Sequence, residues 1–275
     1  MSWGALSRTG TAISSAPQLI QKGSPVLWID IETYSTVDIR KSNVYRYSED
    51  PEFLILMAAW AHDNDPVQLA VGRDEILAIP GLFDPEVTKV AHNAAFERIC
   101  FSRLSGLPTG QYRHPSEYLD TMACLAEMGY PRSLSGATKA VGQEVKDSAG
   151  TRLINLFCKP NRKGQRTLPE ERPEEWEKFC GYCVQDVVSM RSAAQTAMLS
   201  TWPGMTWWPN AAEREAYIAD QLVNDRGIKV DLQLATEAQA AAEDNRMVHE
   251  LEVMQLTGVA NPSSTQQLLA WLQSQ

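Results

Sequence analysis

Short apolar runs, typical of β-strands, fill the first third of the chain. The run VLWIDIE at 26–32 is apolar and gains acidic residues toward its end, which predicts a buried strand. The turn residues Asn64, Asp65 and Pro66 separate two further runs, so we expect strands at 53–62 and 67–71 to pair as a hairpin. Additional strands are predicted at 44–47 and 87–91.

Helical segments dominate the rest of the sequence. Acidic residues in the first turn of the segment 174–199 suit the helix dipole, and Ser133 is a candidate N-cap. Strands followed mainly by helices predict an α/β fold in which helices flank a mixed sheet. The predicted helices are 93–104, 118–128, 133–141, 149–157, 174–199, 211–224, 231–256 and a last one that follows Asn261-Pro262-Ser263-Ser264.

A domain boundary is predicted at 201–210, where the segment TWPGMTWWPN carries two prolines, a glycine and three tryptophans. We interpret Trp202, Trp207 and Trp208 as a hydrophobic joint between domains, although exposed tryptophans can also stack on bases. Residues 1–24 are small and polar and are expected to form a flexible arm. The main domain then covers 25–200, and 211–275 forms a small helical extension without a large core of its own.

The composition, 44% hydrophobic and 21% charged, is that of a globular protein. The longest apolar stretch, 53–61, is about half of what a membrane helix needs, so no membrane partner is expected. No signal peptide is evident at the N-terminus. Five cysteines are an odd number, which argues against a disulfide framework and predicts a reducing, cytoplasmic location. The pair Cys180 and Cys183 lies in a predicted helix without a second pair for zinc, so we interpret it as structural thiols.

The net charge of −9 alone argues against a nucleic-acid partner, because proteins that bind phosphates are usually basic. The segment 148–169, however, contains no acid. Its basic residues are Arg152, Lys159, Arg162, Lys163 and Arg166. From charge alone, a solvated loop and a phosphate-binding segment are equally consistent with this pattern.

Three pairs of polar residues carry the candidate chemistry. Asp30 and Glu32 are two apart on a strand, so both side chains leave the same face. A divalent cation such as Mg²⁺ would compensate two acids at the end of a buried strand. Tyr182 and Asp186 are four apart on one helix face, and so are Asn93 and Glu97 on the predicted helix 93–104. Each pair alone is also typical of solvated surface residues.

Together these segments supply four acids: Asp30, Glu32, Glu97 and Asp186. In one mechanism of phosphodiester hydrolysis, two divalent cations about 4 Å apart clamp the attacking and leaving oxygens. Such a pair of cations needs several carboxylates to bind it and to balance its positive charge. Part of the negative charge of the chain is then the charge of a site. The residues therefore indicate a metal-dependent phosphodiesterase, in which Tyr182 aims the attacking water.

The same segments resemble a known family. DIET at 30–33, HNAAFER at 92–98 and YCVQD at 182–186 are similar, in order and spacing, to the three motifs of the DnaQ-like (DEDDy) 3′–5′ exonucleases, in particular the proofreading domain of family A (DNA polymerase I-like) polymerases. Asp120-Thr121-Met122 resembles the element that follows the second motif in that family. The resemblance covers about residues 25–200.

The resemblance implies a ribonuclease H-like fold and two Mg²⁺ ions, with Mn²⁺ as a substitute. Asp30, Glu32 and Asp186 would hold the first metal, and Asp30 would bridge to the second, with Glu97 nearby. Asn93 would position the second motif or the substrate, and Tyr182 the water. The family usually has Asp where this chain has Glu97, so the second metal would be bound differently, directly or through water.

The extension enlarges the resemblance. The segments 216–231 and 257–272 look like the opening of a family A polymerase domain, and polymerases of phage type resemble the chain most. No polymerase active-site motif is found in this sequence. We therefore expect the exonuclease half of such a polymerase, either truncated or free-standing, with the remaining polymerase domain as a partner.

The predicted activity is removal of nucleoside 5′-monophosphates from the 3′ end of single-stranded DNA. The basic segment, with Lys159, Arg162 and Lys163, is a candidate contact to the strand, and Thr33 is a candidate contact to the terminal nucleotide. Two alternatives stay open: a non-catalytic binding module, against which the complete acid set argues, and an exonuclease that trims RNA.

Overall fold

The computed structural model describes residues 25–143, 150–201 and 210–275 of the chain. The predicted arm at 1–24 and the three tryptophans of the predicted linker lie outside the described residues. The chain divides into two compact units, which are described separately. The N-terminal unit ends at Arg226, and the C-terminal unit comprises Gly227–Gln275. The predicted boundary at 201–210 stays a prediction.

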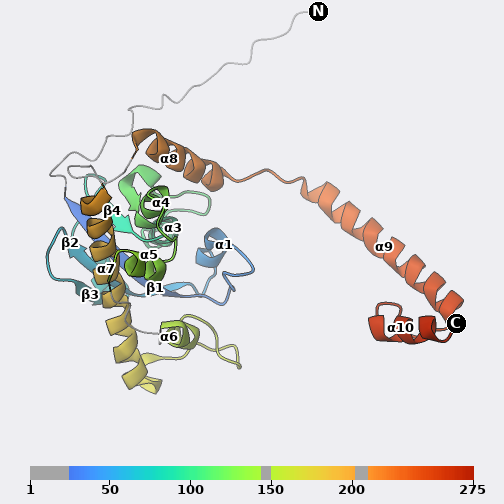
Figure 1. The fold of residues 1–275 in the computed structure, drawn as a ribbon. Helices are drawn as coiled ribbons and strands as arrows, with labels where there is room; N and C mark the ends of the chain where they lie inside the picture. The colour runs from blue at the N-terminus through green and yellow to red at the C-terminus, as the bar shows by residue number, and fades with distance from the viewer. Residues whose placement is uncertain (1–24, 144–149, 202–209) are drawn as a thin grey trace, which may run out of the picture. The chain divides into compact units, whose positions relative to one another are not determined.

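A five-stranded mixed sheet forms the centre of the N-terminal unit (Figure 1). The strands are β1 (Val26–Tyr34), β2 (Leu54–His62), β3 (Gln68–Val71), β4 (Thr88–Ala91) and β5 (Tyr118–Asp120). Their order is β3-β2-β1-β4-β5, in which β2 is antiparallel to both of its neighbours while β1, β4 and β5 are parallel. This is the ribonuclease H-like arrangement, and it confirms the predicted fold class.

Eight α-helices belong to the described part of this unit. They are α1 (Val44–Ser48), α2 (Arg73–Leu77), α3 (Ala95–Leu104), α4 (Thr121–Glu127), α5 (Leu134–Ala140), α6 (Gly150–Phe157), α7 (Pro173–Thr201) and α8 (Ala211–Arg226). Two short 3₁₀ helices, η1 (Pro115–Glu117) and η2 (Pro169–Glu171), join them. Ser133 caps α5 as predicted, because its side chain accepts a hydrogen bond from the Gly136 N–H.

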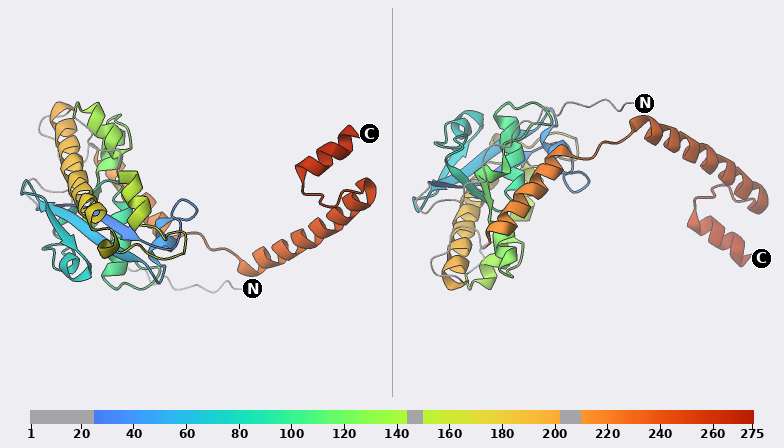
Figure 2. Two further views of the ribbon diagram at one scale, coloured as in Figure 1. Left: turned by 90° about the horizontal axis from the view of Figure 1, so that it is seen from below. Right: turned by 90° about the horizontal axis from the view of Figure 1, so that it is seen from above.

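The two faces of β1 explain how the unit is layered. Alternate residues of a strand point to opposite faces. Trp28 and Tyr34 pack in one buried cluster with Phe179 of α7, whereas Ile29 packs in a second cluster with Phe101 of α3. Helix α7 therefore covers one face of the sheet and α3 covers the other (Figures 1 and 2). Because both faces are covered, β1 is buried along nearly its whole length, including its acidic end.

Two predicted elements are wrong. Residues 44–47 form part of helix α1 instead of a strand, because the Asn43 side chain accepts a hydrogen bond from the Arg46 N–H and starts a helical turn. A run of four residues is too short for its period to separate the two structures. The predicted helix 118–128 begins with the strand β5, and α4 starts only after Asp120, whose carboxylate accepts hydrogen bonds from two backbone N–H groups.

The second motif also departs from the prediction. Asn93 lies outside α3, in a left-handed backbone conformation with φ of 70°. Asparagine tolerates this conformation better than most residues other than glycine. The chain therefore turns sharply between β4 and α3. Asn93 and Glu97 do not share one helix, although they lie at the same end of α3.

The C-terminal unit consists of α9 (Leu232–Thr257) and α10 (Thr265–Gln273). Asp231 and Ser264 cap the two helices, and Gly258 ends α9 in the left-handed conformation. All of 227–275 is described, and within it only Val259 is buried. The helices are thus set by caps and propensity, without a core of their own. None of the described helices of the chain has the length and apolarity to cross a membrane.

Candidate metal centre

Three carboxylates meet at the face of β1 that α7 covers. Asp30 and Glu32 come from β1, and Asp186 comes from α7. Each offers one oxygen, and these oxygens all lie within 4.8 Å of one another. Helix α7 is held against β1 by the buried side chains of Cys183 and Val187, which flank Asp186 along the helix. Packing of α7 on β1 thus completes the cluster from sequence segments far apart.

Without a cation, burial of the three carboxylates costs the protein folding free energy. Burial raises the pKa of Asp30 and of Glu32 well above their ordinary values, and the charge of Asp186 raises both further. Burial also raises the pKa of Asp186, to about 6. Among the described residues, no lysine or arginine forms an ion pair with any of the three. A divalent cation with oxygen ligands would compensate them, so the donor set fits a metal such as Mg²⁺.

Glu97 is the fourth acid. It lies in the first turn of α3 and is 3% exposed. Burial and the charge of Asp30 raise the pKa of Glu97 well above its ordinary value. Its Oε2 atom is buried and has no hydrogen-bond partner in the described structure. A buried carboxylate oxygen without a hydrogen-bond partner is also suited to binding a cation.

Two thiols contact the acids, and the sequence pattern did not reveal this. The Cys183 thiol donates to Asp30 Oδ2 over 3.7 Å, and the Cys158 thiol donates to Glu32 Oε2 over 3.6 Å. Burial raises the pKa of both thiols, so they remain neutral donors. Each contact orients one carboxylate. Cys180, the other member of the Cys-x-x-Cys pair, lies partly exposed on α7 and carries a free thiol.

Tyr182 lies one helical turn before Asp186 on α7. Its ring stacks on that of Phe179, with centroids 6.3 Å apart and planes 13° apart. On another side, the ring approaches the backbone of Gly150 so closely that a Cβ atom built there would lie 2.4 Å from Tyr182 Cε2. Burial and the nearby carboxylate of Asp186 raise the pKa of the Tyr182 hydroxyl, so it stays protonated. It is therefore a neutral hydrogen-bond donor beside the acids.

Asn93 connects the second motif to another buried acid. The Asn93 N–H donates to Asp120 Oδ1 over 2.9 Å, and the Met122 N–H donates to the same oxygen over 2.9 Å. The Tyr217 hydroxyl donates to Asp120 Oδ2 over 3.0 Å. Asp120 thus holds the turn that leads into α3 and to Glu97. Nothing in the sequence around Tyr217 indicates this contact.

Comparison with known proteins supports the resemblance inferred from the motifs. Over 258 residues the chain is 38% identical to a DNA polymerase of Bacillus phage SP02, and the match covers 90% of the chain. This chain is therefore similar to part of a phage DNA polymerase. It spans 38% of that polymerase's length. No family model matches the chain.

Two solved structures share features of its fold. The structure of Escherichia coli RNase D, an exoribonuclease involved in structured RNA processing, matches with a TM-score of 0.44 and 18% identity over 74% of this chain and 46% of that chain. The apo form of a nuclease matches with a TM-score of 0.41 and 13% identity over 71% of this chain and 80% of that chain.

The other predicted contact residues differ in burial and in their contacts. Thr33 is buried, and its hydroxyl shares a hydrogen bond of 2.9 Å with that of Tyr47. Lys159 donates to the side chain of Asn155 over 2.7 Å. Arg162 and Lys163 are exposed in the loop after α6. Their contacts to a strand stay predictions.

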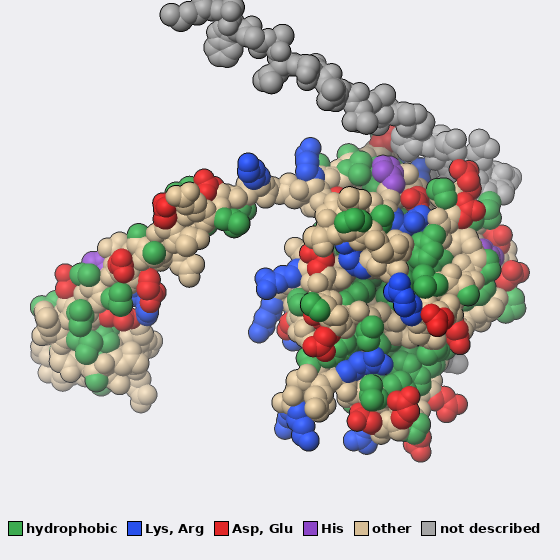
Figure 3. All heavy atoms as spheres, turned by 180° about the vertical axis from the view of Figure 1, so that it is seen from behind, with side chains coloured by type: hydrophobic (Ala, Val, Ile, Leu, Met, Phe, Trp, Pro, Cys, Tyr) green, Lys and Arg blue, Asp and Glu red, His purple; other side chains and the backbone are tan. Residues whose placement is uncertain are grey.

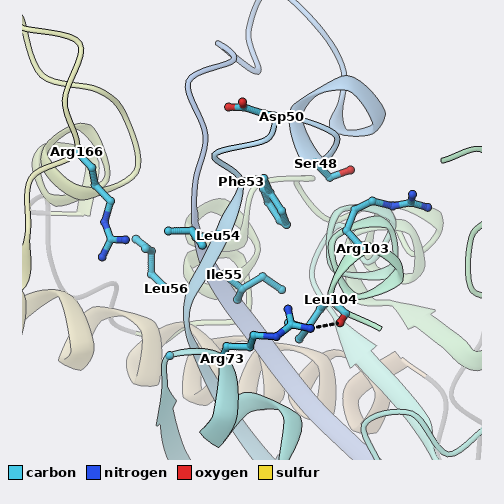
Figure 4. Close-up of a pocket in the computed structure, with 11 residues that line it drawn as sticks. Ser48, Asp50, Phe53, Leu54, Ile55, Leu56, Arg73, Arg103, Leu104 and Arg166 are labelled. Carbon is cyan, nitrogen blue, oxygen red and sulfur yellow. Dashed lines mark hydrogen bonds between the residues drawn. The ribbon is translucent and has the colours of Figure 1, made fainter. Parts of the chain in front are cut away.

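A separate groove of about 410 Å³ lies at the edge of β2 (Figure 4). Leu54, Ile55 and Leu56 line it, together with three arginines that come from different segments, Arg73, Arg103 and Arg166. None of the four acids of the metal centre lines this groove. Arg73 donates to the Leu104 carbonyl, and Arg103 to that of Gln111, so these two side chains also join neighbouring segments.

Proposed function

We propose that the chain is a metal-dependent 3′–5′ exonuclease that removes nucleoside 5′-monophosphates from the 3′ end of single-stranded DNA, as the proofreading part of a DNA polymerase. One observation carries the proposal: the oxygens of Asp30, Glu32 and Asp186 lie within 4.8 Å of one another, buried or half-buried, and no lysine or arginine among the described residues forms an ion pair with them. The sequence similarity to a phage DNA polymerase supports DNA as the substrate.

The residues suit two divalent cations. Asp30, Glu32 and Asp186 would hold the first, and Asp30 with Glu97 the second, with Mg²⁺ as the expected ion and Mn²⁺ as a substitute. When bound, such ions activate a water and stabilise the charge that develops on the phosphodiester oxygens. The side chain of Glu97 is one methylene longer than the aspartate usual in the exonuclease family, which lets its orphaned oxygen reach further toward the second ion.

The residues around the acids orient the reaction. The neutral Tyr182 hydroxyl, beside Asp186, hydrogen-bonds the attacking water and aims it at the terminal phosphodiester. The thiols of Cys158 and Cys183 hold one oxygen of Glu32 and of Asp30. The remaining carboxylate lone pairs then stay directed to the cations.

The strand would follow the basic surface near the site. Figure 3 shows that lysine and arginine side chains lie mainly on one side of the visible face of the N-terminal unit, whereas many acidic side chains lie on the other. This uneven distribution explains how a chain with a net charge of −9 can bind a polyanion. Lys159, Arg162 and Lys163 are the proposed phosphate contacts, and Thr33 and Asn93 border the site of the terminal nucleotide.

The test uses the purified chain with a 5′-labelled single-stranded DNA and an RNA of the same sequence, each with Mg²⁺, Mn²⁺ or EDTA. We expect a metal-dependent ladder that shortens the DNA from its 3′ end and is absent with Asp30→Ala. A ladder on RNA alone would contradict the proposed substrate and favour an RNA-trimming enzyme. Absence of cleavage on both substrates, with binding retained, would favour a non-catalytic binding module.

A further inference from the structure

Helix α8 is joined to the rest of the N-terminal unit by a buried ion pair. The guanidinium of Arg98 is 1% exposed and donates to both oxygens of Asp225, each over 2.8 Å. The Tyr45 hydroxyl donates to Asp225 as well, over 2.8 Å. Arg98 directly follows Glu97 on α3, so the pair holds α3 beside the fourth acid of the metal centre. Bidentate arginine–carboxylate pairs restrict geometry more than single contacts do.

A second contact from α8 reaches the turn on the other side of Glu97. The Tyr217 hydroxyl and the Asn93 N–H bind different oxygens of the same carboxylate, that of Asp120. Asp120 is 1% exposed, so its oxygens depend on these donors and on the start of α4. We call Arg98, Asp120, Tyr217 and Asp225 the α8 clamp. The clamp therefore holds α3 both before and after Glu97.

Glu97 itself has little else to orient it. Its Oε2 atom has no hydrogen-bond partner among the described residues, so its position depends on where α3 begins. Helix α8 lies beside α3 and α4 in Figure 1 and packs against η1. The sequence resemblance assigns this helix to the opening of a polymerase domain, whereas its contacts belong to the N-terminal unit.

We propose that α8 completes the nuclease site, with Asp225 and Tyr217 as positioning residues that place Glu97 for the second metal ion. The inference rests on the proposed function and adds to it a segment that the three motifs do not include. It implies that a nuclease fragment ending before 211 has a misplaced Glu97, even where the sheet and α7 are intact.

The test compares three variants of the full chain: Asp225→Asn, Tyr217→Phe and Asp220→Asn. Asp225→Asn removes the charge that Arg98 needs, and Tyr217→Phe removes one hydroxyl while the ring stays. Asp220→Asn is the matched control, because Asp220 is exposed on the same helix and its side chain bonds only within α8. Mn²⁺ binding is measured by calorimetry, and kcat, KM and the Mg²⁺ midpoint of activity are measured on single-stranded DNA.

We expect Asp225→Asn and Tyr217→Phe to weaken Mn²⁺ binding and to lower kcat, each by about tenfold, because residues that orient metal ligands typically contribute this much. KM for the strand should not change, and Asp220→Asn should behave as wild type. A purely structural role would lower the melting temperature but leave Mn²⁺ affinity and kcat per folded molecule unchanged, which would overturn the inference. If Asp225→Asn does not fold, Tyr217→Phe decides.

Failure of the inference and failure of the proposed function give different results. A wild-type chain that degrades DNA, together with clamp variants that do so equally well, overturns the inference alone. A wild-type chain that binds Mn²⁺ without cleaving overturns the proposed function, and the Mn²⁺ affinities of the variants still decide the inference. A wild-type chain with neither property overturns both.

Discussion

Two groups of buried charges in the N-terminal unit are arranged in opposite ways. In the α8 clamp, Arg98 meets Asp225 in a bidentate pair, so the protein itself balances the charge. At the metal centre, Asp30, Glu32 and Asp186 face one another, and no basic side chain of the described structure pairs with them. The first group is balanced within the protein, whereas the mutual repulsion in the second opposes folding unless a cation compensates it.

This difference in charge balance distinguishes buried charges that serve the fold from buried charges that serve a function, without any comparison with related proteins. Burial of a charge costs free energy unless it is paired, so an unbalanced buried group persists only where another requirement holds it. At the metal centre we propose that this requirement is the binding of a cation. Removal of one acid should therefore have opposite effects on folding stability in the two groups.

Asp30→Asn should have the largest effect, and only on activity. We expect a loss of DNA cleavage on the order of 10⁴-fold, about 5.5 kcal/mol in transition-state stabilisation, because Asp30 would contact both metal ions. In EDTA the same variant should unfold at a temperature equal to or above that of the wild type, because one repulsive charge is gone. Retained activity, or clear destabilisation in EDTA, would contradict the proposed contrast between the paired charges of the α8 clamp and the unpaired acids of the metal centre.

Arg98→Met should have the opposite profile, with its primary effect on stability. We expect a loss of about 4 kcal/mol in the free energy of unfolding, because Asp225 is left buried without its partner. Chemical denaturation measures this loss. The control is the double variant with Asp225→Leu, which removes both charges and should recover most of the stability. No recovery would show that the packing of Arg98, not its charge, is what matters.

The raised pKa of Asp186 at the metal centre should make the folding stability depend on pH. The pKa of Asp186 is raised from 3.8 to about 6 in the folded chain, so between these values the folded state binds more protons than the unfolded state. In EDTA, stability should therefore fall as pH rises from about 4 to about 6, by roughly 3 kcal/mol. Saturating Mn²⁺ should reverse this trend at the upper end. Denaturation at fixed pH values, with Asp186→Asn as control, measures it.

The acids of the metal centre could be predicted because their spacing along the sequence determines which face of a strand or helix they occupy. Asp30 and Glu32 are two apart on a strand, which places them on one face, and Tyr182 and Asp186 are one helical turn apart. The buried apolar run of β1 is equally local. Four of the five strands and most helices followed from such patterns, which require no knowledge of distant contacts; β5 did not, because 118–120 was predicted as part of a helix.

The clamp and the second motif depend on distant contacts instead. Arg98 and Asp225 are 127 positions apart, and neither lies in a pattern that would pair them. Asn93 leaves the helix because its N–H bonds to Asp120, in a strand that sequence reasoning assigned to a helix. Residues 44–47 form a helix because of one cap at Asn43. In the last two cases a side-chain hydrogen bond decides the local structure.

Gly150 offers the smallest and most local test of the metal centre. Its replacement by alanine would put a Cβ atom 2.4 Å from Tyr182 Cε2, so the ring would have to move. Displacement of a positioned catalytic group by about 1 Å can cost up to 10²-fold in rate. For Gly150→Ala we expect a tenfold loss in kcat, about 1.4 kcal/mol, with KM for the strand unchanged.

The control for this variant is the glycine next to Tyr182 itself. Gly181→Ala meets no atom within 4 Å, so it should leave the rate unchanged and raise stability slightly through helix propensity. In a Tyr182→Ala background, Gly150→Ala should cause no further loss of rate, because the ring with which the new methyl group collides is absent. An additional loss there would mean that Gly150 acts through α6 as a whole, and Tyr182 would then be held by the stacking on Phe179 alone.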